Sequence, residues 1–237
     1  RRKRPPLHVH ALPWAAEPLA VVALLGGRDG WPGTGAPVAR LIPLPGATFS
    51  ELTLQGFRGE SAGLFATESR NDLAYNAHYR LFRDLSDATN VDLGLSYARG
   101  PNDAAPGART RLEGVDATVR WKPLRSATYR STVFRGEYIR SRREQPGGDQ
   151  NARGWFVAGD YQLAKRWFVG ARLEAADHPD NAASTDRGKA LVLTFWPSEF
   201  SQLRGELRRR VYFDRTVANE LLLQLQFAIG AHGAHPF

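Results

Sequence analysis

The sequence contains no cysteine and no methionine among its 237 residues. Without cysteine the chain cannot form disulfides, thiolate metal sites or a covalent haem attachment, so redox chemistry by the chain itself is not expected. A helix that spans a membrane needs roughly 18 apolar residues in a row. The nearest candidate, residues 18–25, is too short and is followed by Gly26 and Gly27. These residues therefore do not predict a membrane protein built from helices.

The sequence also lacks a phosphate loop, a dinucleotide fingerprint and a paired metal-ligand motif, so we expect no cofactor and no enzymatic activity. Its net charge of +8, from 32 Lys+Arg against 24 Asp+Glu, would suit nucleic acid, anionic solutes or lipopolysaccharide phosphates. The basic residues are spread along the chain and do not gather in one helix or arm. Nucleic-acid binding is therefore not expected.

What the chain does contain is eleven stretches with the character of β-strands, each about ten residues long, joined by links that alternate between short and long. The short links fall at 44–48, 83–89, 123–128, 164–166 and 197–200, and the long polar ones at 59–71, 100–110, 142–152, 177–186 and 211–216. A barrel of the bacterial outer membrane has tight turns at its periplasmic end and loops outside. The pattern predicts an all-β fold, an antiparallel up-and-down transmembrane β-barrel with 11 to 12 strands in this chain, as part of a larger barrel.

Side chains alternate across a strand, so each stretch can be divided into two faces. In residues 91–97 one face carries Val91, Leu93, Leu95 and Tyr97, and the other carries Asp92, Gly94 and Ser96. Similar divisions occur in residues 73–81, 115–122, 155–163, 167–174, 203–208 and 221–229. Two stretches are ambiguous, because residues 187–196 are apolar on both faces and residues 35–43 contain two prolines.

A soluble β-sandwich also alternates, so strand length and aromatic placement must separate the two folds. Soluble strands are about 5 to 6 residues long. Ten residues tilted by about 45° rise roughly 23 Å, close to the ~25 Å apolar band of an outer-membrane barrel. Aromatic residues that we expect at or near strand ends, as in interfacial girdles, are Trp121, Tyr129, Trp155, Trp167, Phe195, Trp196, Tyr212 and Phe213.

The strand count also predicts how the chain is divided. Bacterial barrels have an even number of strands, and the chain starts at Arg1 without a signal peptide, so we expect a mature or truncated portion that lacks N-terminal strands. Residues 1–34 are then an external loop or a remnant of missing strands, residues 35–229 the barrel strands and residues 230–237 a periplasmic tail. Residues 18–35 would form either a small helix folding over or into the pore, or a twelfth strand.

Four segments carry a resemblance to a known family: residues 84–89 (DLSDAT), 97–102 (YARGPN), 196–201 (WPSEFS) and 224–237 (QLQFAIGAHGAHPF). They resemble the C-terminal half of a family of Gram-negative outer-membrane, porin-like proteins, whose members are often labelled porins or zinc-regulated, TonB-dependent-receptor-like proteins. The resemblance covers roughly residues 10–237 and implies a location in the bacterial outer membrane. It also implies recognition by the barrel assembly machinery through a terminal aromatic, for which either Phe237 or the pair Phe227 and Ile229 qualifies.

The polar faces supply the candidate functional residues. Assigning faces by alternation places Arg40 inside and predicts as pore-lining residues Arg80, Arg120, Lys122, Arg135, Glu137, Arg172, Glu174, Arg204 and Arg208. Rings of Arg and Lys favour anions in a water-filled pore. Mixed charges can instead form ion-pair ladders that hydrate a lumen, so anion preference is a hypothesis here.

Two further chemistries have candidate residues. His8, His10, His232 and His235 carry imidazoles of the kind that binds zinc, but no carboxylate or cysteine lies beside them at ligand spacing, so no metal site is predicted. His78, Asp92 and Ser96 all point inward and have the residue types of a nucleophile and its base. A histidine among polar lumen residues is more often lumen lining.

Together these features predict an outer-membrane channel for the passive diffusion of small hydrophilic solutes, anion-preferring if the positive lumen charge prevails, with outer-membrane lipid and lipopolysaccharide as its surroundings. One alternative is a TonB-dependent-type receptor for a metal or metal chelate, which would require a plug domain. Another is a structural barrel that sheathes a partner protein.

Overall fold

The computed structural model of the chain describes residues 15–25, 33–59, 64–66, 72–179, 181–198 and 200–227. These residues form one short helix, α1 (Leu19–Leu24), and eleven strands: β1 (Gly33–Leu41), β2 (Thr48–Gly59), β3 (Ala74–Ser86), β4 (Thr89–Pro101), β5 (Arg109–Trp121), β6 (Thr132–Arg143), β7 (Gln150–Ala164), β8 (Trp167–His178), β9 (Asn181–Ser198), β10 (Ser201–Val211) and β11 (Val217–Phe227). No helix in this part of the chain is long and apolar enough to cross a membrane.

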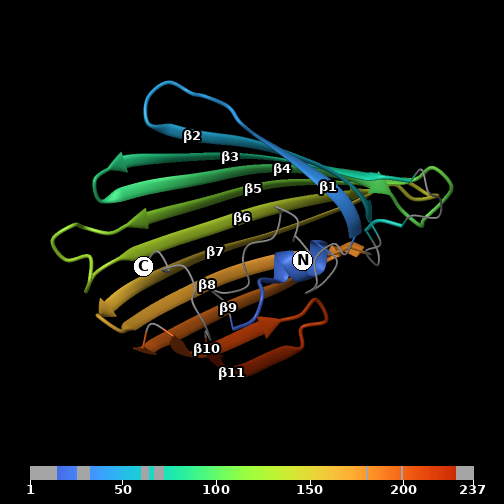
Figure 1. Cartoon of the computed structure of the whole chain (residues 1–237). Helices are drawn as coiled ribbons and strands as arrows, with labels where there is room; N and C mark the ends of the chain where they lie inside the picture. Colours follow the sequence, from blue (N-terminus) through green and yellow to red (C-terminus); the bar gives the residue numbers. More distant parts are fainter. Residues whose placement is uncertain are drawn as a thin grey trace.

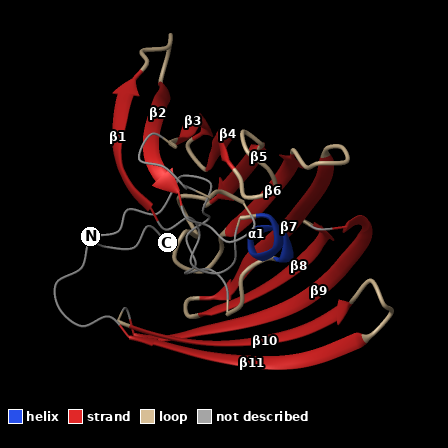
Figure 2. Ribbon diagram, turned by 90° about the vertical axis from the view of Figure 1, so that its right-hand side faces the viewer, coloured by secondary structure: helices blue, strands red, loops and turns tan. Residues whose placement is uncertain are grey.

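All eleven strands belong to one sheet, in which every strand pairs antiparallel with the next strand along the chain (Figure 1). The prediction of an all-β, up-and-down antiparallel fold with eleven strands is confirmed. The sheet curves into an open arc with β1 and β11 at its two edges, and α1 lies on the concave side (Figure 2). No ladder between β1 and β11 is present among the described residues.

The predicted strict alternation of short and long links is wrong at two places. Residues 177–186 were expected to form a long loop, but Asp177 pairs with Thr185 and only residues 179–180 separate β8 from β9. Four of the six residues 181–186 are polar, a composition typical of a loop. The hydrogen bonds between paired strands come from the backbone and tolerate polar side chains. The link at 123–128 was expected to be short but extends over residues 122–131, where Arg130 N–H donates to the Ser126 carbonyl at 2.8 Å.

The two faces of the sheet are chemically opposite. On the convex face large apolar side chains are exposed, for example Leu95 at 54%, Leu191 at 61% and Leu223 at 81%. The concave face carries the polar set, and Asn76 and Glu206 on it are buried. In the ambiguous residues 187–196, Leu191 belongs to the convex face and residues such as Val192 to the concave one. The sheet therefore has an apolar convex side and a concave side that carries the polar residues of the alternating pattern, together with buried apolar residues such as Leu112 and Ile139.

Two assignments of side chains along the strands are wrong. Arg40 does not share the concave face, because it pairs with Leu52, which pairs with Tyr79 of the convex face. The prolines of the first strand obscured this register. Trp155 lies inside β7, which starts at Gln150, and not at a strand end. Trp121 and Trp167 do occupy strand ends, and the Trp167 ring stacks on Phe195 at a centroid distance of 4.5 Å.

The helix α1 lies against the concave face and contacts β6, β7, β8 and β9. Its buried residues Ala20, Val21 and Leu24 join an apolar cluster with Leu25, Phe57, Leu64, Phe65, Ala74, Ala98, Leu112, Ile139 and Ala152. Of the two alternatives for residues 18–35, the small helix on the inner side is therefore present. A close approach at Gly154 makes this possible, because a Cβ there would lie only 2.9 Å from the Ala20 Cβ.

We expect Gly154→Leu to displace α1 from the sheet, because overpacking at such a contact costs about 1–3 kcal/mol. The chain has no cysteine, so Val21→Cys supplies a single buried thiol whose maleimide labelling rate reports the position of the helix. Labelling should become about tenfold faster in the Gly154→Leu background. Gly136→Leu is the matched control, because a Cβ at Gly136 has only ordinary contacts, the nearest at 3.6 Å. Equal labelling rates in the two backgrounds would contradict this packing.

Candidate functional site

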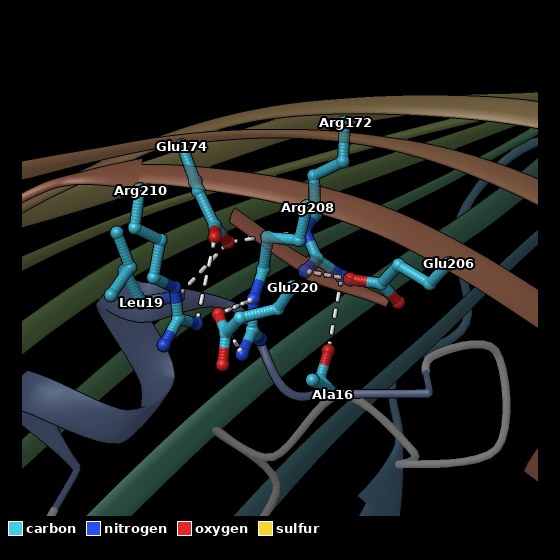
Figure 3. A network of polar contacts seen from close by, with 8 residues as sticks. All are labelled: Ala16, Leu19, Arg172, Glu174, Glu206, Arg208, Arg210 and Glu220. Atoms are coloured by element: carbon cyan, nitrogen blue, oxygen red, sulfur yellow. Dashed lines mark hydrogen bonds and ion pairs between the residues drawn. The ribbon is translucent and has the colours of Figure 1, made fainter. Parts of the chain in front are cut away.

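Six charged residues of the concave face form the cluster shown in Figure 3, called here the anchor cluster: Arg172, Glu174, Glu206, Arg208, Arg210 and Glu220. Arg172 lies between two carboxylates, with Nε 3.1 Å from Glu174 Oε2 and Nη2 2.9 Å from Glu206 Oε1. Arg208 Nη2 lies 2.7 Å from Glu220 Oε2. The strands β8, β10 and β11 supply these residues because each presents alternate positions to the concave side.

The anchor cluster also holds the segment that leads into α1. The backbone N–H of Leu19 donates to Glu174 Oε2 at 3.1 Å, and Arg172 Nη1 donates to the carbonyl of Ala16 at 3.1 Å. The first N–H groups of a helix have no partner within the helix, and a carboxylate near them is favourable. The two residues therefore bind a donor and an acceptor of the N-terminal backbone at once.

Burial makes this cluster sensitive to substitution. The side chains of Arg172 and Glu206 are fully buried, and that of Glu174 is 1% exposed. Removing one partner from a buried ion pair leaves an uncompensated charge, whereas the intact pair is close to neutral in its net contribution. The cluster therefore fixes where α1 docks more than it adds to overall stability.

A second group of charges lies on β3 to β7, where the concave face remains accessible to water. Arg80 donates from Nε and Nη2 to the two oxygens of Asp92 at 2.9 and 2.6 Å, and its side chain is 46% exposed. Arg120 lies 3.9 Å from the same carboxylate. Arg135 Nη1 lies 2.6 Å from Asp160 Oδ2. Arg80, Asp92, Arg120, Arg135 and Asp160 lie on five consecutive strands and form a row of mixed charge, called here the accessible row.

The nine predicted pore-lining residues divide between these environments. Five are buried: Arg172, Glu174 and Arg208 in the anchor cluster, Arg204 donating from Nε to Thr194 Oγ1 at 3.0 Å, and Glu137 opposite Asp116. Arg80, Arg120 and Arg135 belong to the accessible row. Lys122 is partly exposed and follows the last residue of β5. The structure thus places eight of the nine on strands and one in a link.

Sequence reasoning missed Glu220 and the backbone groups of Ala16 and Leu19. Alternation along β11 could have found Glu220, because it has the same parity as Gln224, which pairs with Arg204 of the concave face. The docking of a distant backbone N–H onto Glu174 has no sequence signal, since 155 residues separate the two groups.

The structure brings together only two of the three residues with possible catalytic chemistry. His78 Nδ1 and Ser96 Oγ are 2.9 Å apart, but the Asp92 carboxylate is held by Arg80. Among the described residues no group of three or more His, Cys, Asp and Glu side chains is placed to hold a metal ion. His8, His10, His232 and His235, together with Ile229 and Phe237, lie outside the described residues.

Comparisons with known proteins give two similarities. No protein-family model matches the chain. An uncharacterised protein of Aquifex aeolicus (strain VF5) is 27% identical over 271 aligned residues, which cover 97% of this chain and 56% of that protein. The chain thus spans just over half the length of this relative. A solved KdgM porin in complex with disordered oligogalacturonate has a TM-score of 0.38 and 9% identity, covering 84% of this chain and 94% of that chain.

We expect Arg172→Met to lower the free energy of unfolding by about 3–5 kcal/mol, because Glu174 and Glu206 would lose their buried partner. Arg80→Met is the matched control, and its half-exposed ion pair should contribute no more than about 1 kcal/mol. Urea unfolding of the folded protein in detergent, followed by tryptophan fluorescence, measures both. Similar unfolding midpoints for the two variants would show that loss of the buried ion pairs costs no more stability than loss of the half-exposed one.

Proposed function

We propose that the chain is part of a β-barrel channel of the bacterial outer membrane that lets small hydrophilic solutes diffuse passively. The observation that carries this proposal is the two-sided sheet, whose convex face exposes rows of Leu, Val and aromatic side chains while its concave face carries the charged and polar ones. Soluble monomers rarely expose apolar patches of more than a few hundred Å². Hydrocarbon outside and water inside is the arrangement that suits both faces of one curved sheet.

Backbone hydrogen bonding supports the same arrangement. In hydrocarbon each backbone N–H and C=O must be paired within the protein, which a closed barrel achieves. Each inner strand, β2 to β10, has ladders on both sides. The outer edges of β1 and β11 have no ladder among the described residues, and unpaired edges favour association with further strands. We therefore propose that strands pairing with these edges complete the barrel in the whole protein.

The accessible row is the proposed path of the solute. The side chains of Arg80 and Arg120 are 46% and 42% exposed on the concave side. In the anchor cluster, Arg172, Glu174 and Glu206 are covered. Arg120 lies 3.9 Å from Asp92, a carboxylate already bound twice by Arg80. The positive charge of Arg120 is therefore only partly compensated, and an excess of positive charge in a pore favours anions. We propose a moderate anion preference on this ground.

We propose no enzymatic activity for this concave face. The His78 and Ser96 pair is assigned to lumen lining, because Asp92 binds Arg80 instead of orienting the imidazole. A channel also needs no energy-coupled plug domain, unlike the receptor alternative.

If the convex face meets hydrocarbon, Val157→Arg should reduce folding into lipid bilayers, because an arginine at the bilayer midplane costs about 2–4 kcal/mol. The control is Thr53→Arg, a partly buried position that pairs with Ala39 and His78 on the opposite side of the sheet. Folding yield into phosphatidylcholine vesicles, measured by the shift in electrophoretic mobility without boiling, tests the prediction. An intact protein that stays monomeric and compact without detergent would contradict the membrane location.

If the accessible row sets selectivity, Arg120→Glu in the intact protein should move the reversal potential in a potassium chloride gradient toward cation preference. The charge changes by two units on a side chain that is 42% exposed to the concave side. Arg166→Glu makes the same charge change in the exposed link between β7 and β8, and it should leave the potential nearly unchanged. Single-channel recording in planar bilayers provides the measurement, and cation preference in the unmodified protein would remove the proposed anion preference.

A further inference from the structure

Three exposed basic side chains lie together on the convex face, at the edge of the apolar band near the end of β10: Arg187, Lys189 and Arg209, called here the basic patch. Lys189 pairs directly with Arg209, and Arg187 is two positions away on the same side of β9. Alternation fixes their direction, because the neighbouring convex residues Leu191 and Leu207 are 61% and 59% exposed. The basic patch therefore adjoins the surface that the proposed function places in hydrocarbon.

The charges of the basic patch are not compensated by the described part of the chain, where no ion pair joins any of the three to a carboxylate. The nearby carboxylates of Glu174 and Glu220 belong to the concave face, where they bind Arg210 and Arg208. The Asp177 carboxylate, close to Arg187, accepts hydrogen bonds from the Arg153 backbone N–H and the Thr185 hydroxyl. Like charges directly opposite each other on neighbouring strands are destabilising. Their placement at the rim of an apolar band indicates an anionic group supplied from outside the protein.

Two grooves of the sheet surface adjoin the basic patch. One, of about 620 Å³, has apolar walls that include Leu173, Leu207 and Leu221, with Lys189, Arg209 and Asn219 along it. The other, of about 530 Å³, is lined by Tyr138, Trp155 and Leu173, with Arg187 along it. Arg153 and Asp177 also line this groove, and their Nε and Oδ2 atoms lie 3.8 Å apart. Leu173 lines both grooves, so they lie side by side. Each groove combines an apolar wall with a cationic edge, which matches the chemistry of an acyl chain below a phosphate group.

We infer that the basic patch binds the phosphate groups of a phosphorylated glycolipid of the surrounding leaflet, whose acyl chains occupy the two grooves. Guanidinium groups form bidentate hydrogen bonds with phosphate oxygens, and Lys189 adds a point charge between Arg187 and Arg209. Asn219, which pairs with Arg209 and is exposed, adds an amide donor to the same site. This inference rests on the proposed function, because it requires the convex face to lie in a membrane.

The test uses the intact protein in dodecyl maltoside micelles, titrated with bisphosphorylated lipid A and, separately, with the same lipid after removal of both phosphates. Native mass spectrometry measures the affinity for each. The doubly substituted Lys189→Gln, Arg209→Gln protein should bind the phosphorylated lipid about tenfold more weakly or worse, since each basic residue near a lipid surface contributes appreciably. The dephosphorylated lipid should bind the unmodified and substituted proteins alike.

The matched control is Lys165→Gln, Arg166→Gln, which removes the same charge from the exposed link between β7 and β8. This link lies at the opposite end of the strands from the basic patch. It should bind the phosphorylated lipid as the unmodified protein does. Equal loss in the two double variants, or equal affinity of the unmodified protein for both lipids, would overturn the inference. A wrong proposed function would give a different result from a wrong lipid site. In that case the unmodified protein would not fold into phosphatidylcholine vesicles.

Discussion

One constraint organises the described part of the chain: an eleven-strand antiparallel ladder keeps chemically different side chains on its two faces. Because side chains alternate strictly, a slip of one residue between two strands would move a complete set of leucines to the polar side. The register keeps Leu93 opposite Leu81 and Ala117, and Asp92 opposite Phe82 and Thr118. The same alternation therefore specifies strand pairing, the apolar outer surface and the polar inner surface together.

The concave face serves two purposes in separate places. Over β8 to β11 buried ion pairs bind the N-terminal backbone through Arg172 and Glu174, and α1 completes an apolar cluster with strand ends. Over β3 to β7 the side chains of Arg80 and Arg120 remain accessible to water. A helix held on the inner side occupies space that a bare barrel would leave to water. The chain thus combines a fixed element with an open, charged region on one surface.

The residues that were placed correctly from sequence are those whose position depends only on local alternation. In β3, for example, alternation predicted one face with Asn76, His78 and Arg80 and the other with Tyr75, Ala77 and Tyr79. The pairing of β3 with β2 and β4 follows this division. Prediction failed where local pattern and backbone pairing conflict. Four of the six residues 181–186 are polar, yet this segment still pairs with β8. Arg40 faces outward in a strand containing Pro37. The candidate site was predicted as a set of inward residues, but not as two environments.

The sequence by itself determined the number and order of the strands and which side chain in most of them faces which way, because these follow from a two-residue period along a single segment. Only the tertiary structure decided which inward charges are buried and which are accessible. Arg172 and Arg80 occupy equivalent inward positions in the alternating pattern. Arg172 is nevertheless buried and bonded to the segment leading into α1, whereas the Arg80 side chain is 46% exposed. That difference arises from contacts between residues more than 150 positions apart, for which alternation contains no information.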